Sequence, residues 1–167
     1  SAEGSRSVIR EKLDPDFEKG IKWFVAYQNY YEGTSDLDPC FYHGFLESRF
    51  GEVYAWFNVK DGLQIFGTAA RKGTKIYPYL SEYTKMLENS FGLKRKKLVR
   101  QTGCLGNDMC TTGRFYLGKG KVLLVGEAAG FLNAFGEGIS CALSTGLFAA
   151  EAITKGLKSG NDALAIY

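Results

Sequence analysis

The stretch from Lys121 to Ile153, KVLLVGEAAGFLNAFGEGISCALSTGLFAAEAI, constrains the fold of this 167-residue chain more than any other segment. It opens with four apolar residues, Val122 to Val125, the short run expected of a buried strand. A loop with glycines at 126, 130, 136 and 138 follows, and an alanine-rich apolar segment then predicts a helix that starts near Glu137. Such an arrangement can cradle an anionic or polar ligand, because glycines let the backbone approach closely and first-turn N–H groups lack helical partners. A tight connection that binds nothing has the same pattern, so support must come from elsewhere in the chain.

The composition argues against several classes of protein. An apolar fraction of 45% and an aromatic fraction of 14% are typical of a globular chain and not of a disordered one. A formal net charge of +3 is too small to indicate a nucleic-acid partner, and the basic run over 94–97 is typical of a solvated strand edge. Four cysteines without a C-x-x-C pair, with His43 as the only histidine, argue against a zinc or iron–sulfur site.

Signals for export or for membrane insertion do not occur in the sequence. No apolar run reaches about 18 residues without a polar break, and no signal-peptide pattern opens the chain. We therefore expect a cytoplasmic protein, with peripheral association with a membrane left open as an alternative.

Residue patterns predict an antiparallel sheet covered by one helix. Aromatic and β-branched residues indicate strands over 21–31, 41–48 and 52–60, and Asp61–Gly62 predicts a hairpin that leads into a further strand over 63–71. We expect three or four of these strands to follow one another as an antiparallel meander. The apolar spacing then changes to that of an amphipathic helix over 76–91, which Gly92 ends and which we expect to lie over the sheet.

Shorter elements are expected on either side of this sheet. Ser5 or Ser7 can cap a short helix that carries Val8, Ile9 and Leu13. The basic segment over 94–103 returns to an extended pattern, the glycine-rich stretch over 103–120 is typical of a loop, and the chain ends in a polar segment over 155–167.

Three motifs occur in order along the chain. They are Glu3–Gly4–Ser5–Arg6–Ser7–Val8–Ile9–Arg10, then Tyr54–Ala55–Trp56 with Lys60, and finally Gly126–Glu127–Ala128–Ala129–Gly130 followed by Gly136–Glu137–Gly138–Ile139. Taken together they resemble the D-G-x-x-S-x-x-R, Y-x-W-x-F-P-K and G-D-A-A-G…G-E-G-I motifs of FAD-dependent oxidoreductases of the geranylgeranyl reductase type. These enzymes belong to a larger group that also holds the aromatic hydroxylases and the electron-transfer flavoprotein dehydrogenases of the FixC type.

The resemblance implies that the chain binds FAD. The cofactor-binding positions that it carries over are Glu3, Gly4, Arg10, Gly126, Glu127, Ala128, Gly130, Gly136, Glu137, Gly138 and Ile139. In the family the motif acid, Glu127 here, bonds the ribityl chain, and the helix that starts at Gly138 faces the pyrimidine edge of the flavin. Tyr54 and Trp56 would contact the substrate. The motifs assign no catalytic acid or base.

The sequence departs from the family pattern at several points. Glu3 and Glu127 stand where aspartate is usual, the spacer over 131–135 is one residue short and lacks its proline, and Asn58–Val59 replaces Phe-Pro. The N-terminal βαβ unit with G-x-G-x-x-G, which binds the FAD pyrophosphate in the family, has no counterpart among these residues. We therefore expect the chain to be a C-terminal segment that does not retain FAD alone.

The expected fold is α+β. An antiparallel substrate-domain sheet with a covering helix would be joined to a strand–loop–helix piece of an FAD-binding domain of the glutathione-reductase or hydroxylase type. Residues 1–20 would hold the end of the flavin-domain motif and a short helix. Residues 21–104 would form the substrate-binding sheet domain, and residues 105–167 the C-terminal part of the FAD-binding domain.

The function implied by the resemblance is that of a fragment, inactive alone, of an FAD-dependent oxidoreductase. The whole protein would reduce double bonds of a geranylgeranyl-type isoprenoid or a similar apolar substrate by hydride transfer from the flavin. Gly130 favours reduction, because the aromatic hydroxylases usually place a histidine there. NAD(P)H and ferredoxin both stay open as electron donors. The alternatives are an FAD-dependent monooxygenase of the same superfamily and a degenerate, non-catalytic ligand-binding module.

Overall fold

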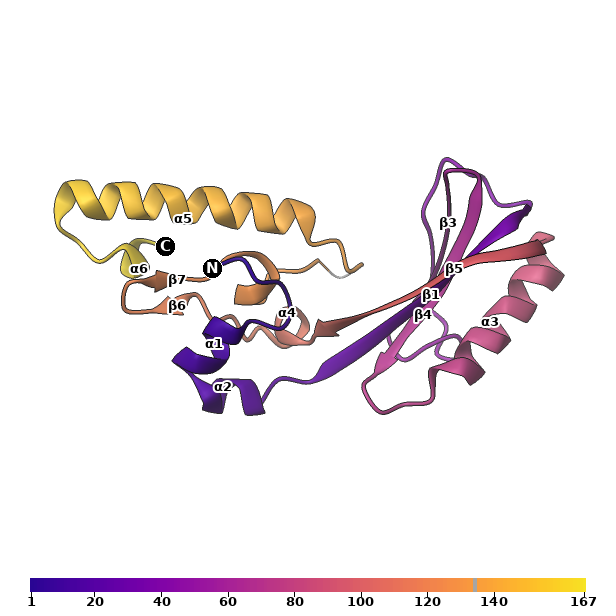
Figure 1. Cartoon of the computed structure of the whole chain (residues 1–167), viewed down its shortest axis with the longest axis horizontal. Coiled ribbons are helices and arrows are strands. Elements are labelled where there is room, and N and C mark those ends of the chain that lie inside the picture. The colour runs from indigo at the N-terminus through magenta and orange to yellow at the C-terminus, as the bar shows by residue number, and fades with distance from the viewer. Residues whose placement is uncertain (134) are drawn as a thin grey trace. The chain divides into compact units, whose positions relative to one another are not determined.

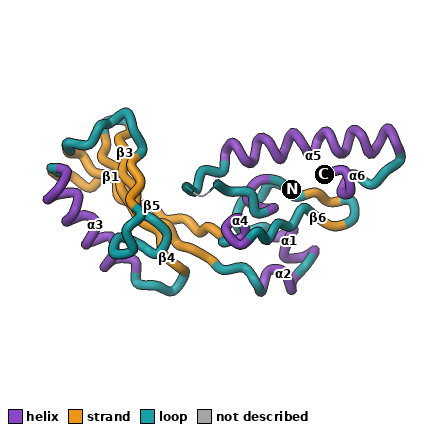
Figure 2. The backbone as a smooth tube through the Cα atoms, turned by 180° about the vertical axis from the view of Figure 1, so that it is seen from behind, coloured by secondary structure: helices purple, strands orange, loops and turns teal. Residues whose placement is uncertain are grey.

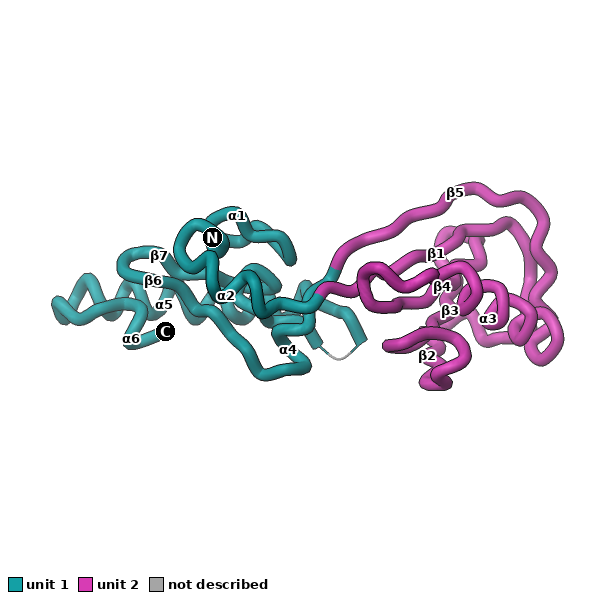
Figure 3. Tube along the Cα trace, turned by 90° about the horizontal axis from the view of Figure 1, so that it is seen from below, with its two compact units in different colours: residues 1–22, 106–167 teal, residues 23–105 magenta. Residues whose placement is uncertain are grey.

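The computed structural model describes residues 1–133 and 135–167, which form two compact units (Figure 1). Unit 1 holds Ser1–Lys22 and Gly106–Tyr167, and unit 2 holds Trp23–Leu105 (Figure 3). Helices and an antiparallel sheet make up the fold, so the α+β class predicted from the sequence is confirmed. The cofactor and substrate roles expected for the segments stay predictions.

Unit 2 is a five-stranded antiparallel sheet with the strand order β2-β3-β4-β1-β5. Its strands are β1 Trp23–Thr34, β2 His43–Phe45, β3 Ala55–Lys60, β4 Leu63–Arg71 and β5 Lys94–Asn107, the last two residues of β5 belonging to unit 1. The meander predicted for three or four strands is confirmed for β2, β3 and β4, and it does not extend to β1, which pairs with β4 along nine residues and not with β2. The three-residue β2 offers a much shorter ladder, and the strand predicted over 41–48 is reduced to it.

The predicted hairpin at Asp61–Gly62 connects β3 to β4. Both residues have positive φ, 53° and 74°, as a two-residue hairpin turn with the twist of its strands requires. The turn sets the register, in which Lys60 faces Leu63 and Phe57 faces Phe66.

Helix α3, Ile76–Phe91, covers one face of this sheet (Figure 1) and has the bounds predicted from its apolar spacing. Gly92 ends it in a left-handed conformation with φ 60°, which glycine adopts without a steric penalty. The helix buries Leu80, Tyr83 and Leu87 against the sheet. Together they form the main core cluster with Phe50, Ala55, Phe57, Phe66 and Leu93.

Unit 1 is built from short elements that lie along one side of one long helix (Figure 2). The elements are α1 Val8–Leu13, α2 Pro15–Lys19, α4 Met109–Thr112, β6 Gly118–Lys119, β7 Val122–Leu123, the 3-10 helix η1 Gly126–Ala129, α5 Ile139–Ser159 and α6 Ala163–Ile166. Ser7 caps α1 as predicted. The strand predicted over 122–125 pairs with β6 only through its first two residues, and the segments expected to be loop or polar tail contain α4 and α6. Among the described residues, no helix has the length and apolar character needed to cross a membrane.

One hydroxyl in the core of unit 2 has no partner among the described residues. The ring of Tyr83 is fully buried among the rings of Phe45, Phe50 and Phe66, and its hydroxyl finds no hydrogen-bond partner in the described part of the chain. Replacing Tyr83 by Phe should therefore raise the free energy of unfolding by about 1 kcal/mol, because it removes an unsatisfied buried group without leaving a cavity. Urea denaturation measures the change. The control is Tyr31→Phe, which removes a hydroxyl that interacts with Arg95 and should therefore not raise the stability of the chain. A loss of stability in Tyr83→Phe would contradict the interpretation.

Candidate functional site

The glycine turn predicted as a ligand cradle is the short helix η1 and the residues that flank it. Gly126 and Gly130 have φ of 59° and 99°, values that side chains other than glycine rarely adopt. A Cβ atom at Gly130 would lie 2.9 Å from the Cβ atom of Met109, and one at Gly126 would lie 3.0 Å from that of Ala142. Both glycines are therefore needed for backbone conformation and for close packing.

Thr145 fixes the turn against α5. Its buried hydroxyl accepts the N–H of Gly126 at 2.8 Å and donates to the carbonyl of Cys141 at 2.7 Å. This contact joins the first residue of η1 to the second turn of α5 across 19 positions. The sequence signal is weak, because α5 carries further hydroxyl side chains at Ser140, Ser144 and Thr154, and sequence reasoning missed it.

The loop before α5 is organised by Asn133 and Glu137. The side-chain oxygen of Asn133 accepts the N–H groups of Phe135 and Glu137 at 3.0 and 2.8 Å, while Ala134 lies outside the described residues. The Glu137 carboxylate accepts the N–H of Ser140 at 2.8 Å and its hydroxyl at 2.5 Å, and these bonds lower the pKa of Glu137. A negative charge thus stabilises the start of α5, whose N-cap is Gly138.

Glu127 is the half-buried acid of the turn. Burial raises the pKa of Glu127, and the neighbouring Arg10 opposes this shift. No donor among the described residues binds its carboxylate, which lies near the backbone of Gly106. The side chain can therefore accept a hydrogen bond from a ligand hydroxyl.

Arg10 is fully buried and holds three segments of unit 1 together. Its Nη1 donates to the carbonyl of Ala128 at 2.6 Å, its Nη2 donates to the carbonyl of Ser5 at 2.9 Å, and its Nε pairs with Glu18. We expected Arg10 at the cofactor, but its guanidinium points into the protein and makes these bonds. Its contact with η1 brings the first and third sequence motifs together.

Glu3 and Gly4 form the loop that precedes α1. The carboxylate of Glu3 accepts the hydroxyl of Ser7 at 2.7 Å and the N–H of Ile9 at 3.0 Å, which lower the pKa of Glu3. Gly4 adopts φ 73° in the turn. The acid therefore reinforces the N-terminus of α1, and its role toward a cofactor stays a prediction.

Tyr54 and Trp56 belong to unit 2, where they lie beside one another with ring centroids 5.5 Å apart. Successive residues of β3 alternate between the faces of the sheet, so Trp56 faces away from the core that contains Ala55 and Phe57. Its indole N–H donates to Gln28 at 3.0 Å, and a Cβ atom on Gly67 in the neighbouring strand would lie 2.6 Å from its ring. Both predicted substrate residues thus occupy one site next to the sheet face that α3 leaves uncovered.

Curated relatives extend the comparison beyond the motifs. The chain is 32% identical over 147 residues to the protein CbrA of Escherichia coli O9:H4 (strain HS) and to that of Shigella sonnei (strain Ss046). These alignments cover 86% of the chain but only 38% and 39% of the relatives, so the chain spans less than two fifths of their length. No family model matches the chain.

Two solved structures share the fold of the chain. A geranylgeranyl bacteriochlorophyll reductase-like protein from Thermoplasma acidophilum matches 84% of the chain with a TM-score of 0.67 at 20% identity, using 36% of its own length. A triple mutant of the flavin-dependent brominase Bmp2 matches 87% of the chain with a TM-score of 0.55 at 17% identity, using 38% of its length. The chain therefore has a fold found in part of a reductase-like protein and in part of a flavin-dependent enzyme.

Replacing Arg10 by Met tests its role in holding the site together. The change leaves the Glu18 carboxylate and two carbonyls without their buried donor, so the free energy of unfolding should fall by at least about 3 kcal/mol. Urea denaturation measures the loss, and hydrogen exchange at Gly126 should rise with it. Arg6→Met, which removes the same charge from an exposed position, is the control. Equal stabilities of the two variants would contradict a holding role for Arg10.

Replacing Glu127 by Gln tests the raised pKa of its carboxyl. The folded chain keeps the proton of Glu127 to a higher pH than the unfolded chain, whose pKa is near 4.5, so stability falls as pH rises through this interval. Glutamine cannot ionise. Glu127→Gln should therefore melt at a higher temperature than the wild type at pH 7 and lose this advantage below pH 4.5. Glu151→Gln, on an exposed glutamate of α5, controls for the loss of a surface charge. A constant difference across pH would rule out the burial effect.

Proposed function

We propose that the chain supplies the flavin-ring side of an FAD site and the substrate-binding sheet of a longer FAD-dependent oxidoreductase. The observation that carries the proposal is the glycine turn of η1, which hydrogen bonds from Arg10 and to Thr145 hold beside the start of α5. The likeness in fold to a geranylgeranyl bacteriochlorophyll reductase-like protein and to a flavin-dependent brominase supports it.

The residues of the turn fit the flavin and ribityl part of FAD. Gly126 and Gly130 give the backbone the turn that carries Glu127, whose half-buried carboxylate can accept a ribityl hydroxyl. The glycines at 136 and 138 lead into α5, whose N-terminus favours negative charge on a neighbouring ring. FAD, when bound, would supply hydride transfer, and these residues would bind it and fix its orientation.

The surface of α5 suggests where the rest of the protein packs. Ile139, Leu143 and Leu157 leave 72–83% of their side chains exposed, and Leu147 and Phe148 are also exposed. An apolar surface of this kind is typical of an interface, because a solvent-facing helix normally carries polar side chains. We propose that it packs against the remainder of the cofactor domain, since the curated relatives are more than twice as long as the chain.

The substrate would lie on the face of the unit 2 sheet opposite α3, against Tyr54 and Trp56. Aromatic rings suit an apolar substrate, although Trp56 itself is only 8% exposed, and the description of the T. acidophilum protein suggests a geranylgeranyl-type isoprenoid. We propose reduction of its double bonds, with NAD(P)H or ferredoxin as the electron donor. Peripheral contact with a membrane belongs to the same proposal, because isoprenoid lipids reside there.

A second candidate is an oxygen-dependent reaction of the flavin, as in a monooxygenase. The likeness in fold to the flavin-dependent brominase favours it. The higher TM-score of the reductase-like protein and the glycine at position 130 favour reduction.

Spectroscopy of the full-length protein tests the proposal. The purified protein should carry bound FAD, and its reduced flavin should be reoxidised by a geranylgeranyl compound without oxygen. Reoxidation only by oxygen would support the monooxygenase instead. Glu127→Ala should weaken FAD binding at least tenfold by removing a charged hydrogen bond, whereas Glu151→Ala should not. A colourless protein that gains no flavin absorbance on adding FAD would overturn both the reductase and the monooxygenase proposals and favour a non-catalytic binding module.

A further inference from the structure

The indole of Trp56 connects three neighbouring strands of the unit 2 sheet. It starts on β3, passes Gly67 on β4 and reaches Gln28 on β1, where its N–H donates to the side-chain oxygen at 3.0 Å. Gly67 is the register partner of both residues, and a Cβ atom there would lie 2.6 Å from the indole and 2.6 Å from the Cβ atom of Gln28. Because position 67 carries no side chain, a residue of β3 can bond to a residue two strands away.

Gln28 uses both polar groups of its side chain in this arrangement. Its oxygen accepts the indole N–H, while its nitrogen donates to the hydroxyl of Tyr30 at 2.6 Å and to that of Thr102 on β5 at 3.3 Å. The indole nitrogen of Trp56 can only donate, so a reversed amide would place two donors against each other. The guanidinium of Arg100 lies 5.3 Å from the centre of the Tyr30 ring and extends the network along β5. The amide of Gln28 thus has one orientation, and that orientation fixes the indole.

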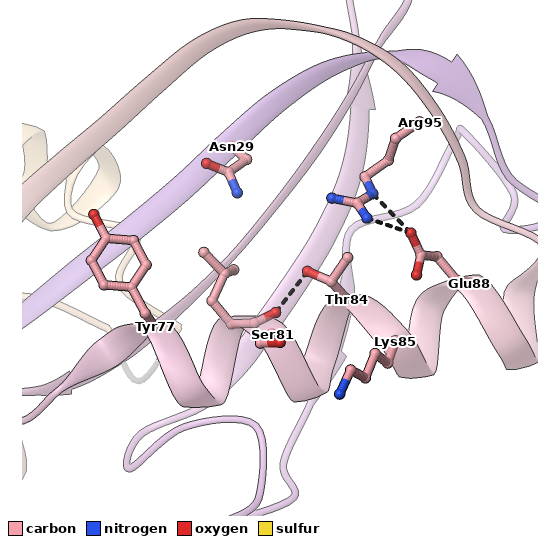
Figure 4. A pocket seen from close by; sticks show the side chains of 8 residues that line it. Asn29, Tyr77, Ser81, Thr84, Lys85, Glu88 and Arg95 are labelled. Atoms are coloured by element: carbon pink, nitrogen blue, oxygen red, sulfur yellow. Dashed lines mark hydrogen bonds and ion pairs between the residues drawn. The ribbon is translucent and has the colours of Figure 1, made fainter.

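The fixed indole supports the ring of Tyr54. The two ring centroids are 5.5 Å apart, and the Tyr54 hydroxyl lies 3.4 Å from that of Tyr42. Trp56 is largely buried, so its position affects a ligand on this face mainly through Tyr54. The next residue of β1, Asn29, lines the cleft between the sheet and α3 (Figure 4), which places Gln28 on the opposite face together with Trp56.

We propose that Gln28 is a positioning residue for the substrate. By fixing the indole of Trp56 it sets the place of Tyr54 and hence the fit of an apolar ligand on this face of the sheet. The inference rests on the proposed function, because it takes the surface at Tyr54 as the place of the substrate. Gln28 acts through Trp56 and not by touching the ligand. An indole without its acceptor would be free to change rotamer, and the ligand would lose contact with the aromatic rings.

Nuclear magnetic resonance of the full-length protein reports on the indole without any substrate. The indole N–H signal of Trp56 is assigned by its loss in Trp56→Phe. In Gln28→Met the amide is replaced by a thioether, a weak acceptor, so the signal should shift and its hydrogen should exchange faster with water. Gln28→Glu keeps an oxygen acceptor and should restore slow exchange. An unchanged Trp56 signal in Gln28→Met would overturn the proposal, whatever the substrate is.

The matched control is Gln101→Met. Gln101 also joins two strands, because it donates to the Asn29 side chain at 2.9 Å, but this bond is on the face that α3 covers. The control should leave the Trp56 signal unchanged. If Gln28→Met does not fold, Gln28→Ala takes its place, since alanine also removes the acceptor.

Reoxidation of the reduced flavin by geranylgeraniol, without oxygen and at constant detergent, tests the effect on the substrate. Gln28→Met should raise KM at least threefold and leave kcat within about twofold, because a displaced support weakens the ground state and the transition state alike. Gln28→Glu and Gln101→Met should behave as the wild type. Equal KM values for Gln28→Met and Gln101→Met would overturn the positioning role.

The two experiments separate this inference from the proposed function. A wild-type protein that geranylgeraniol does not reoxidise would contradict the proposed function, and with it the role of Gln28 toward that substrate. The indole signal would still decide whether Gln28 fixes Trp56. A shifted indole signal with an unchanged KM would show a purely structural bond and would overturn the positioning role alone.

Discussion

Unit 1 depends on the burial of one guanidinium group. Removing the charge of Arg10 from water costs several kcal/mol unless its donors are satisfied, so the bonds to Glu18 and to the carbonyls of Ser5 and Ala128 together stabilise the folded unit. Two motifs that lie more than 110 positions apart in the sequence are thereby fixed to each other. The position of the glycine turn, on which its proposed role rests, is fixed by hydrogen bonds to this single side chain and to the hydroxyl of Thr145.

Elements decided by neighbouring residues could be predicted from the sequence. Gly92 ends α3, Asp61–Gly62 forms the hairpin and Ser7 caps α1, because each outcome depends on contacts within a few residues. Strand order could not be predicted in the same way. β1 pairs with β4 instead of β2, a choice made by the length of the ladders and by the common core beneath them. Local sequence patterns do not show whether β1 pairs better with β4 or with β2.

The candidate site likewise contains some residues that local sequence patterns predict and others that depend on partners distant in the sequence. The glycines at 126 and 130 and the acid at 127 were predictable, because the motif places them in one short segment. The inward direction of Arg10 was not predictable, since it follows from a partner that is distant in sequence. The sequence motif predicted Glu137 as a cofactor-binding residue. Its bonds to Ser140 show that it also stabilises the start of α5.

The contact between Trp56 and Gly67 has a consequence for how the open face of the sheet can evolve. Position 67 has no room for a side chain, because the backbone of β1 and the indole ring both lie too close. The floor beneath the indole is therefore main chain, whose shape does not change when surrounding side chains are exchanged. Related sequences can therefore conserve the backbone surface at this position and vary the side chains around it. The shape of the face would then be conserved while its selectivity for ligands changes.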